Sequence, residues 1–136
     1  MNEQVSDKQK LLRRALQGNA LFSAIFGALF LIINQTLIQF LGLPSGASLT
    51  PLGFGLLGYA GWLLWNARRE KIKVMDGWIA VILDVGWVVG SYALLFVVKF
   101  SHGGKWAVAL VAEVVLLFAV MQWLGLRRVG RSRQVA

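Results

Sequence analysis

The sequence predicts an all-α fold, a single four-helix transmembrane bundle with antiparallel, up-down helices and both termini in the cytoplasm. Three observations predict it. Of the 136 residues, 57% are hydrophobic and the mean hydropathy is +0.65, which is more apolar surface than a soluble domain of this length can bury. Four apolar segments approach the roughly 20 residues that a helix needs to cross a bilayer. The basic residues also gather on one side of these segments.

The four predicted spans are joined by short polar linkers. They cover residues 15–33, 50–67, 77–98 and 105–126. Helices are expected because isolated strands cannot satisfy their backbone groups in lipid, and the segments lack the alternating polarity of barrel strands. Short linkers favour antiparallel neighbours. The mixed stretch 34–43 is predicted to be either the outer end of the first helix or a short interfacial helix.

The distribution of positive charge predicts the orientation. The N-terminal flank, the linker between the second and third spans, and the C-terminal flank hold twelve of the 14 Lys and Arg residues. The other side holds only Lys99 and Lys105. The positive-inside rule then places both termini in the cytoplasm. Contact with anionic lipid headgroups explains the basic clusters, so nucleic acid is not an expected partner.

The sequence points to no catalytic residue, cofactor or metal site. There is no cysteine and one histidine, His102, which excludes thiolate nucleophiles, cysteine-ligated metals and a site with several histidines in one chain. The segment "GFGLLG" at 53–58 matches a dinucleotide-binding pattern. It lies inside an apolar span, however, and that pattern requires a preceding strand and a helix that begins in solvent.

Two glycine patterns predict close helix packing. Gly55, Gly58 and Gly61 recur every three residues in the second span, and Gly86 and Gly90 form a GxxxG pair in the third. Small residues let helix backbones approach closely in membranes. Gly86 and Gly90 lie nearly opposite Asp84 on their helix. The pair therefore fits either a contact within the bundle or the face of a dimer.

Two acidic residues stand inside the apolar spans. Asp84 lies in "LDVGWVVGS" and Glu113 in "LVAEVVLL", both near the middle of a hydrocarbon layer about 30 Å thick. The third and fourth spans form a hairpin, so we expect the two carboxyl groups to face each other in the bundle interior. No Lys or Arg lies in the interior of any span, since Lys105 stands at the very start of the fourth. At least one acid is therefore expected to hold a proton, unless a cation occupies the site.

Other polar side chains fit the same interior. Asn19 and Ser23 share a face of the first span, Tyr59 lies within the second, and Ser91 follows Asp84 by two turns. With Glu113 they are expected to form an inward polar cluster. Such a cluster serves either as structural hydrogen bonding across helices or as a site that carries protons or cations, because ionisable groups inside membranes are often functional.

Three functions remain open at this point. The first is a non-enzymatic accessory or interaction protein that forms a homo-oligomer or binds a membrane-protein partner. The second is a proton- or cation-linked transporter of a small cationic or lipophilic compound, acting as an oligomer. The third is an intramembrane lipid-modifying enzyme with Asp84 and Glu113 as acid and base. The third is the weakest, because the sequence offers no nucleophile, metal set or phosphate-binding motif.

Several segments resemble a known class of proteins. The "LLRRAL" start, the early "GNALFS", the "LDVGWVVGS" of the third span and the closing "QWLGLRR" resemble small four-helix integral membrane proteins of bacteria that carry no assigned activity. The resemblance covers most of the chain. It implies a bacterial inner-membrane location, and it implies no activity and no functional residues.

Overall fold

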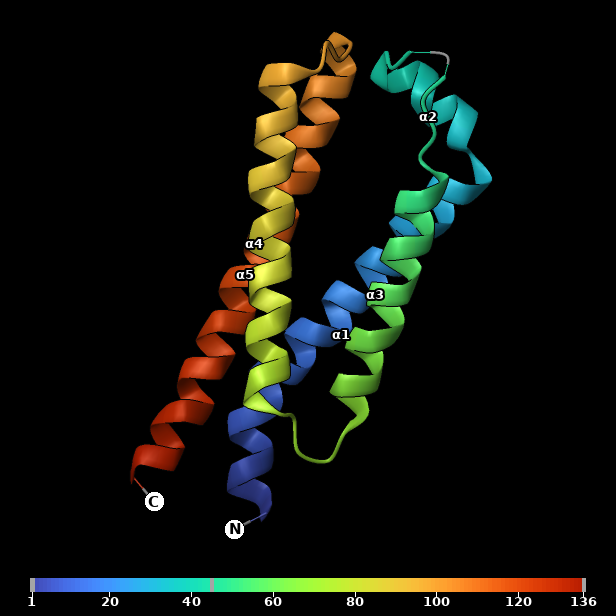
Figure 1. Ribbon diagram of the computed structural model, residues 1–136. Coiled ribbons are helices and arrows are strands. Elements are labelled where there is room, and N and C mark those ends of the chain that lie inside the picture. The colour runs from blue at the N-terminus through green and yellow to red at the C-terminus, as the bar shows by residue number, and fades with distance from the viewer. Residues whose placement is uncertain (1, 45, 136) are drawn as a thin grey trace.

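The described part of the chain is entirely helical. The computed structural model describes the backbone of residues 2–44 and 46–135 and the side chains of residues 9–44 and 46–129. Five helices follow one another without any strand among the described residues (Figure 1). They are α1 (Asn2–Ile32), α2 (Asn34–Leu41), α3 (Thr50–Arg68), α4 (Val74–Val97) and α5 (His102–Val135). The all-α prediction is confirmed.

Three of these helices are long and apolar enough to cross a membrane. The qualifying segments are Gln9–Ile32 of α1, Val74–Val97 of α4 and His102–Val129 of α5. Their length and composition indicate a membrane protein. The second predicted span is a helix, α3, but it is not among the three. Four glycines, a proline and an asparagine dilute its apolar residues.

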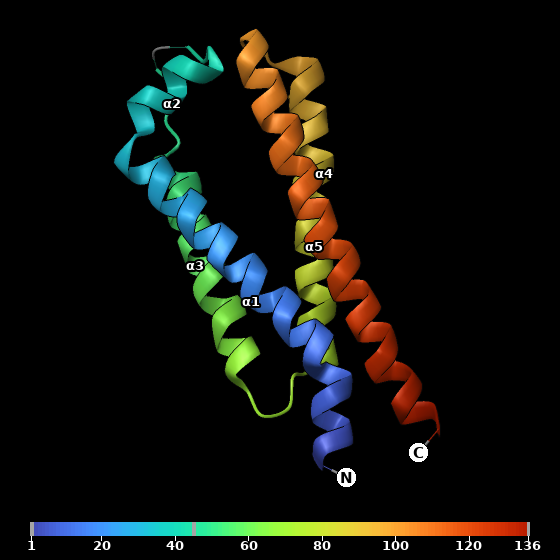
Figure 2. The same ribbon diagram turned by 180° about the vertical axis from the view of Figure 1, so that it is seen from behind.

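The four long helices run alternately in opposite directions, and both chain ends lie at the same end of the molecule (Figure 1). Helix α1 packs along α3, and α4 packs along α5. Helix α1 joins the two pairs because it also packs against α5, crossing obliquely from α5 towards α3 (Figure 2). Helices α3 and α4 make little contact. The helices therefore form two pairs that are open between α3 and α4.

Residues 34–41 form a separate short helix at the end of the molecule opposite the termini. Helix α2 ends at Gly42, whose φ of 73° is a left-handed conformation that favours glycine. The loop between α4 and α5 is fastened to this helix. The backbone N–H of Ser101 donates to the Leu41 carbonyl at 2.9 Å, and the Ser101 hydroxyl donates to the Phe40 carbonyl at 2.5 Å. Of the two alternatives for this stretch, the short helix is the one observed.

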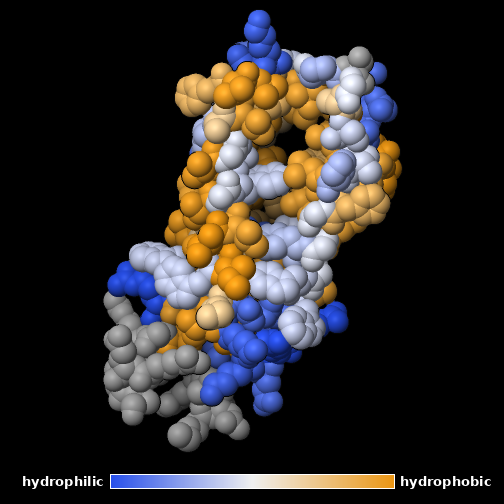
Figure 3. Space-filling model, viewed as in Figure 1, coloured by the Kyte–Doolittle hydropathy of each residue, from blue (hydrophilic) through white to orange (hydrophobic). Residues whose placement is uncertain are grey.

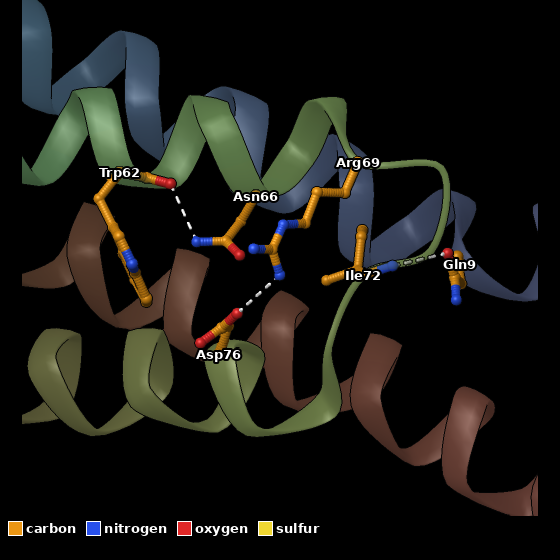
Figure 4. A network of polar contacts seen from close by, with 6 residues as sticks. All are labelled: Gln9, Trp62, Asn66, Arg69, Ile72 and Asp76. Atoms are coloured by element: carbon orange, nitrogen blue, oxygen red, sulfur yellow. Dashed lines mark hydrogen bonds and ion pairs between the residues drawn. The ribbon is translucent and has the colours of Figure 1, made fainter.

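At the end near the termini, polar contacts fasten the linker between α3 and α4 (Figure 4). The Gln9 side chain of α1 accepts a hydrogen bond from the Ile72 backbone at 3.3 Å, and Arg69 pairs with Asp76 of α4 at 3.4 Å. Arg13 of α1 donates to the carbonyls of Ala67 and Arg69 at the last turn of α3, where a cation offsets the negative end of the helix dipole. This end of the molecule is therefore closed.

The five glycines that were predicted to pack do not pack within the chain. A Cβ atom at Gly55, Gly58, Gly61, Gly86 or Gly90 would meet nothing within 4 Å, and all five residues are exposed. These glycines therefore make no close helix contact within the chain, and a contact with a partner helix, the other alternative for Gly86 and Gly90, stays a prediction.

Other glycines allow the close helix crossings. A Cβ at Gly27 of α1 would lie 2.9 Å from the Gly53 carbonyl of α3, and the reverse distance is also 2.9 Å. A Cβ at Gly125 of α5 would lie 2.8 Å from backbone atoms of Leu12 in α1. Backbones this close leave no room for a side chain, so these glycines set the spacing of α1 against its two neighbours.

The two kinds of glycine predict opposite effects of a single methyl group. Gly125→Ala is expected to lower the free energy of unfolding by about 1–3 kcal/mol, because the methyl group forces α5 away from Leu12. Gly86→Ala is expected to leave it unchanged or to raise it by up to about 1 kcal/mol, since alanine is the better helix former. Thermal unfolding in detergent compares the two variants, and equal losses would contradict the assigned crossing.

Candidate functional site

One buried carboxyl group meets side chains from all the long helices. Asp84 of α4 is 2% exposed. Its Oδ2 accepts hydrogen bonds from the Asn19 amide of α1 at 2.7 Å and from the Gln122 amide of α5 at 2.6 Å. Its Oδ1 accepts one from the Tyr59 hydroxyl of α3 at 2.9 Å. Asp84 is thus bonded to α1, α3 and α5 at once.

Further bonds orient the two amide donors. The Ser23 hydroxyl donates to the Asn19 side-chain oxygen Oδ1 at 3.3 Å, which leaves the Asn19 amide nitrogen directed at Asp84. The Gln122 amide also lies 3.0 Å from the Phe118 carbonyl one turn earlier in α5. The Tyr59 hydroxyl lies 3.2 Å from the Ala80 carbonyl of α4. The donors are therefore held in place around the acceptor, as a buried polar network requires.

Most of the predicted polar cluster is present, and one member was missed. Asn19 and Ser23 are buried, and Tyr59 is partly buried in contact with Asp84. Ser91 is buried on the same face of α4, but the donors to Asp84 are those named above. Gln122, which is 0% exposed, was not predicted. Its signal in the sequence is an amide inside the apolar run "LLFAVMQWLGL".

Glu113 does not belong to this cluster. It is exposed, and its side chain accepts a hydrogen bond from the Tyr92 hydroxyl of α4. The prediction that Asp84 and Glu113 face each other in the interior is therefore wrong. Repulsion between the two carboxylates therefore no longer supports protonation of one of them, and the expectation that at least one acid holds a proton stays a prediction that depends on the lack of a basic side chain within the spans.

Helix geometry explains the error. Glu113 and Gln122 are nine residues apart, and at about 100° per residue they lie on opposite faces of α5. The face that turns Gln122 towards Asp84 therefore turns Glu113 outward. Two acids at the same depth in a hairpin therefore need not face each other, because the rotation of each helix about its axis decides which way its side chains point.

A cleft of about 300 Å³ opens beside Asp84. It lies between the α1–α3 pair and the α4–α5 pair and extends from Asp84 towards the end that carries α2, where Phe30 and Pro51 line it. The space-filling view shows this hollow between the two helix pairs, with hydrophobic residues along much of its walls (Figure 3). The hollow opens on the side of the molecule between α3 and α4 (Figure 3), which make little contact with each other.

Aromatic residues form one wall of this cleft. Phe22, Phe26 and Phe30 follow one another every fourth residue along α1, with ring centroids 4.6 Å and 6.3 Å apart. The opposite wall includes Leu83 and Trp87 of α4. Polar groups are few and gather at one end, where Asn19, Ser23, Tyr59 and Asp84 line the cleft. A mostly apolar cavity with a few converging polar groups is the usual form of a small-molecule site.

Among the residues whose side chains are described, no group of three His, Asp or Glu residues lies together as a metal site would require. Comparisons with protein-family models, with curated protein sequences and with solved structures found no match to this chain. The features of this chain that bear on its function are the cleft and the Asp84 carboxyl group.

The two intramembrane acids predict stability effects of opposite sign. Asp84→Leu is expected to destabilise the protein by at least about 1–3 kcal/mol, because three buried donors lose their acceptor. Glu113→Leu is expected to be neutral or stabilising, since it removes an exposed acid from an apolar segment. Unfolding is measured in the same bilayer discs for both variants, and a larger loss for Glu113→Leu would refute this assignment.

Proposed function

We propose that this chain is a multi-pass protein of a bacterial inner membrane, in which α1, α3, α4 and α5 all cross the bilayer. In this arrangement both termini and the linker between α3 and α4 lie in the cytoplasm. Both termini lie at the same end of the molecule, which supports this orientation (Figure 1). Twelve basic residues fall in the same three segments, which supports it as well. Anionic lipid headgroups are the proposed contacts of that end.

The absence of cysteine from the sequence allows a clean test of this topology. A membrane-impermeant maleimide added to intact cells is expected to label Gly46→Cys in the linker between α2 and α3. It is expected to leave Lys71→Cys in the linker between α3 and α4 unlabelled until the membrane is opened. Labelling of Lys71→Cys in intact cells would overturn the orientation.

The proposed role is that of a non-enzymatic accessory or interaction protein that takes an apolar guest from the bilayer into the cleft. The observation that supports this role is the cleft between α3 and α4. Its walls are mostly apolar, and its polar groups lie around Asp84. Asp84 lies ten residues beyond the start of α4, about 15 Å along the helix and close to mid-membrane. A lipid chain or lipophilic molecule can reach such a site without leaving the hydrocarbon layer.

A protein partner is proposed for the outer face of the α4–α5 pair. Glu113, which accepts a hydrogen bond from Tyr92, lies eleven residues, about 16 Å, into the candidate span His102–Val129, and a lipid-exposed acid at that depth is costly. A second copy of the chain or another membrane protein would remove this pair from lipid. Gly86 and Gly90 leave an open outer face on α4 where a partner helix can approach closely.

Proton- or cation-linked transport of a small cationic or lipophilic compound is the second candidate. The specific observation in its favour is that Asp84 lines the cleft as well as joining the helices. A carboxyl group at the end of an apolar path can exchange a proton for a cationic guest. This function adds a coupled movement to the same binding site.

Occupation of the cleft is tested with a phosphatidylcholine that carries a photoactivatable diazirine on its acyl chain. Adducts are expected on Phe26 and Val115 inside the cleft. Gly55→Leu is expected to reduce them at least about fivefold, because Gly55 lines the cleft and has open space for a side chain. Gly61→Leu is the matched control, since Gly61 is equally open but does not line the cleft.

Equal labelling of the two variants, or adducts confined to outward residues such as Val89, would contradict the proposed guest site. The transport candidate is distinguished in sealed vesicles. Accumulation of a lipophilic cation, driven by a pH gradient and abolished by Gly55→Leu, would favour transport, whereas labelling of the cleft without accumulation would favour the accessory role.

A further inference from the structure

A tryptophan that lines the cleft carries a hydrogen-bond donor without an acceptor. The indole Nε1 of Trp87 is buried and finds no partner among the described residues, although Trp87 lines the cleft. A buried N–H that bonds to nothing costs about 1–3 kcal/mol. Native structures rarely keep such a group unless a ligand or a water molecule completes it.

The same cleft holds an acceptor with unused capacity. An ionised carboxylate offers about four acceptor positions on its two oxygens. Oδ2 of Asp84 accepts from both Asn19 and Gln122, whereas Oδ1 accepts only from Tyr59. The hydrogen bonds within the chain therefore use three of these positions and leave one on Oδ1.

The two groups lie on adjoining positions of one helix face. Trp87 follows Asp84 by three residues in α4, a separation that brings side chains together on a helix. Both residues line the cleft. A single small group that donates to Asp84 and accepts from Trp87 would complete both.

We propose that the guest of this cleft is a lipid-like alcohol, an apolar chain with one hydroxyl group. The hydroxyl donates to Oδ1 of Asp84 and accepts from the indole N–H of Trp87. The apolar body lies along the Phe22, Phe26 and Phe30 wall and extends between α3 and α4 into the bilayer. This inference rests on the proposed guest site and adds the chemical class of the guest.

Other head groups complete only one of the two partners. A protonated amine donates to Asp84 but has no lone pair for Trp87, and a quaternary ammonium donates nothing. An ether or ester oxygen accepts a hydrogen bond from Trp87 but donates none, so the free acceptor position on Oδ1 of Asp84 stays unfilled. A hydroxyl carries one donor and two acceptor positions, so it is the smallest neutral group that satisfies both sides of this site.

The test compares four probes of equal chain length in bilayer discs: 1-dodecanol, dodecyl methyl ether, dodecane and dodecyltrimethylammonium. The rise in unfolding temperature is followed as each probe is added, because a molecule that binds only the folded protein stabilises it. The same titration of Gly55→Leu, in which the cleft is filled, is subtracted to remove general effects of the probes on the bilayer.

The alcohol is expected to half-saturate at a concentration about 3- to 10-fold below that of the ether, the equivalent of one hydrogen bond. Trp87→Phe is expected to weaken the binding of dodecanol by about the same factor and to leave the binding of dodecane unchanged. Trp106→Phe is the control, because Trp106 is 65% exposed and does not line the cleft.

Equal binding of alcohol and ether, or an unchanged alcohol affinity in Trp87→Phe, would overturn the hydroxyl assignment. Tighter binding of dodecyltrimethylammonium than of dodecanol would also overturn it, in favour of a cation site. None of these results refutes the guest site itself if the diazirine lipid still labels Phe26 and Gly55→Leu still reduces that labelling. Loss of that labelling would instead refute the proposed function itself.

Discussion

The structure depends on one carboxyl group that accepts hydrogen bonds from three other helices. Asp84 of α4 is bonded to Asn19, Tyr59 and Gln122, which lie on α1, α3 and α5. Lipid offers little hydrophobic force between helices, so packing and hydrogen bonds must hold them together. The three donors also make a buried acid tolerable, because each replaces a contact that water would have made. The positions of the two helix pairs follow from this junction.

The cleft follows from where the other contacts lie. On the terminal side of Asp84, the helices are closed by a core that includes Leu12, Leu63 and Leu126 and by the tight crossing at Gly125. On the far side, α2 is fastened to the loop between α4 and α5 through Ser101. Between these two closures α3 and α4 make little contact, and the apolar cleft remains. The same carboxyl group thus joins the helices and forms the polar end of the cleft.

The sequence was sufficient for the features that depend on composition and local periodicity. Helices close to the four predicted segments are present, and Asn19, Ser23 and Tyr59 do gather at Asp84. Features that depend on helix rotation were not predictable from depth alone. Glu113 turned outward and Gln122 inward because a half-turn separates them on α5. The regular glycine spacing on α3 and α4 does not say which face meets a neighbour, and the close crossings within the chain lie instead at Gly27, Gly53 and Gly125.

The hydrogen-bonded junction at Asp84 is tested most directly by magic-angle-spinning NMR of the protein in lipid bilayers, with ¹³C in aspartate and ¹⁵N in the asparagine and glutamine side chains. Through-space transfer is expected from the Asp84 carboxyl carbon to two side-chain amide nitrogens. One signal is expected to disappear in Asn19→Leu and the other in Gln122→Leu. Transfer from Asp84 to lipid methylene protons, with none to either amide, would show that the junction does not form.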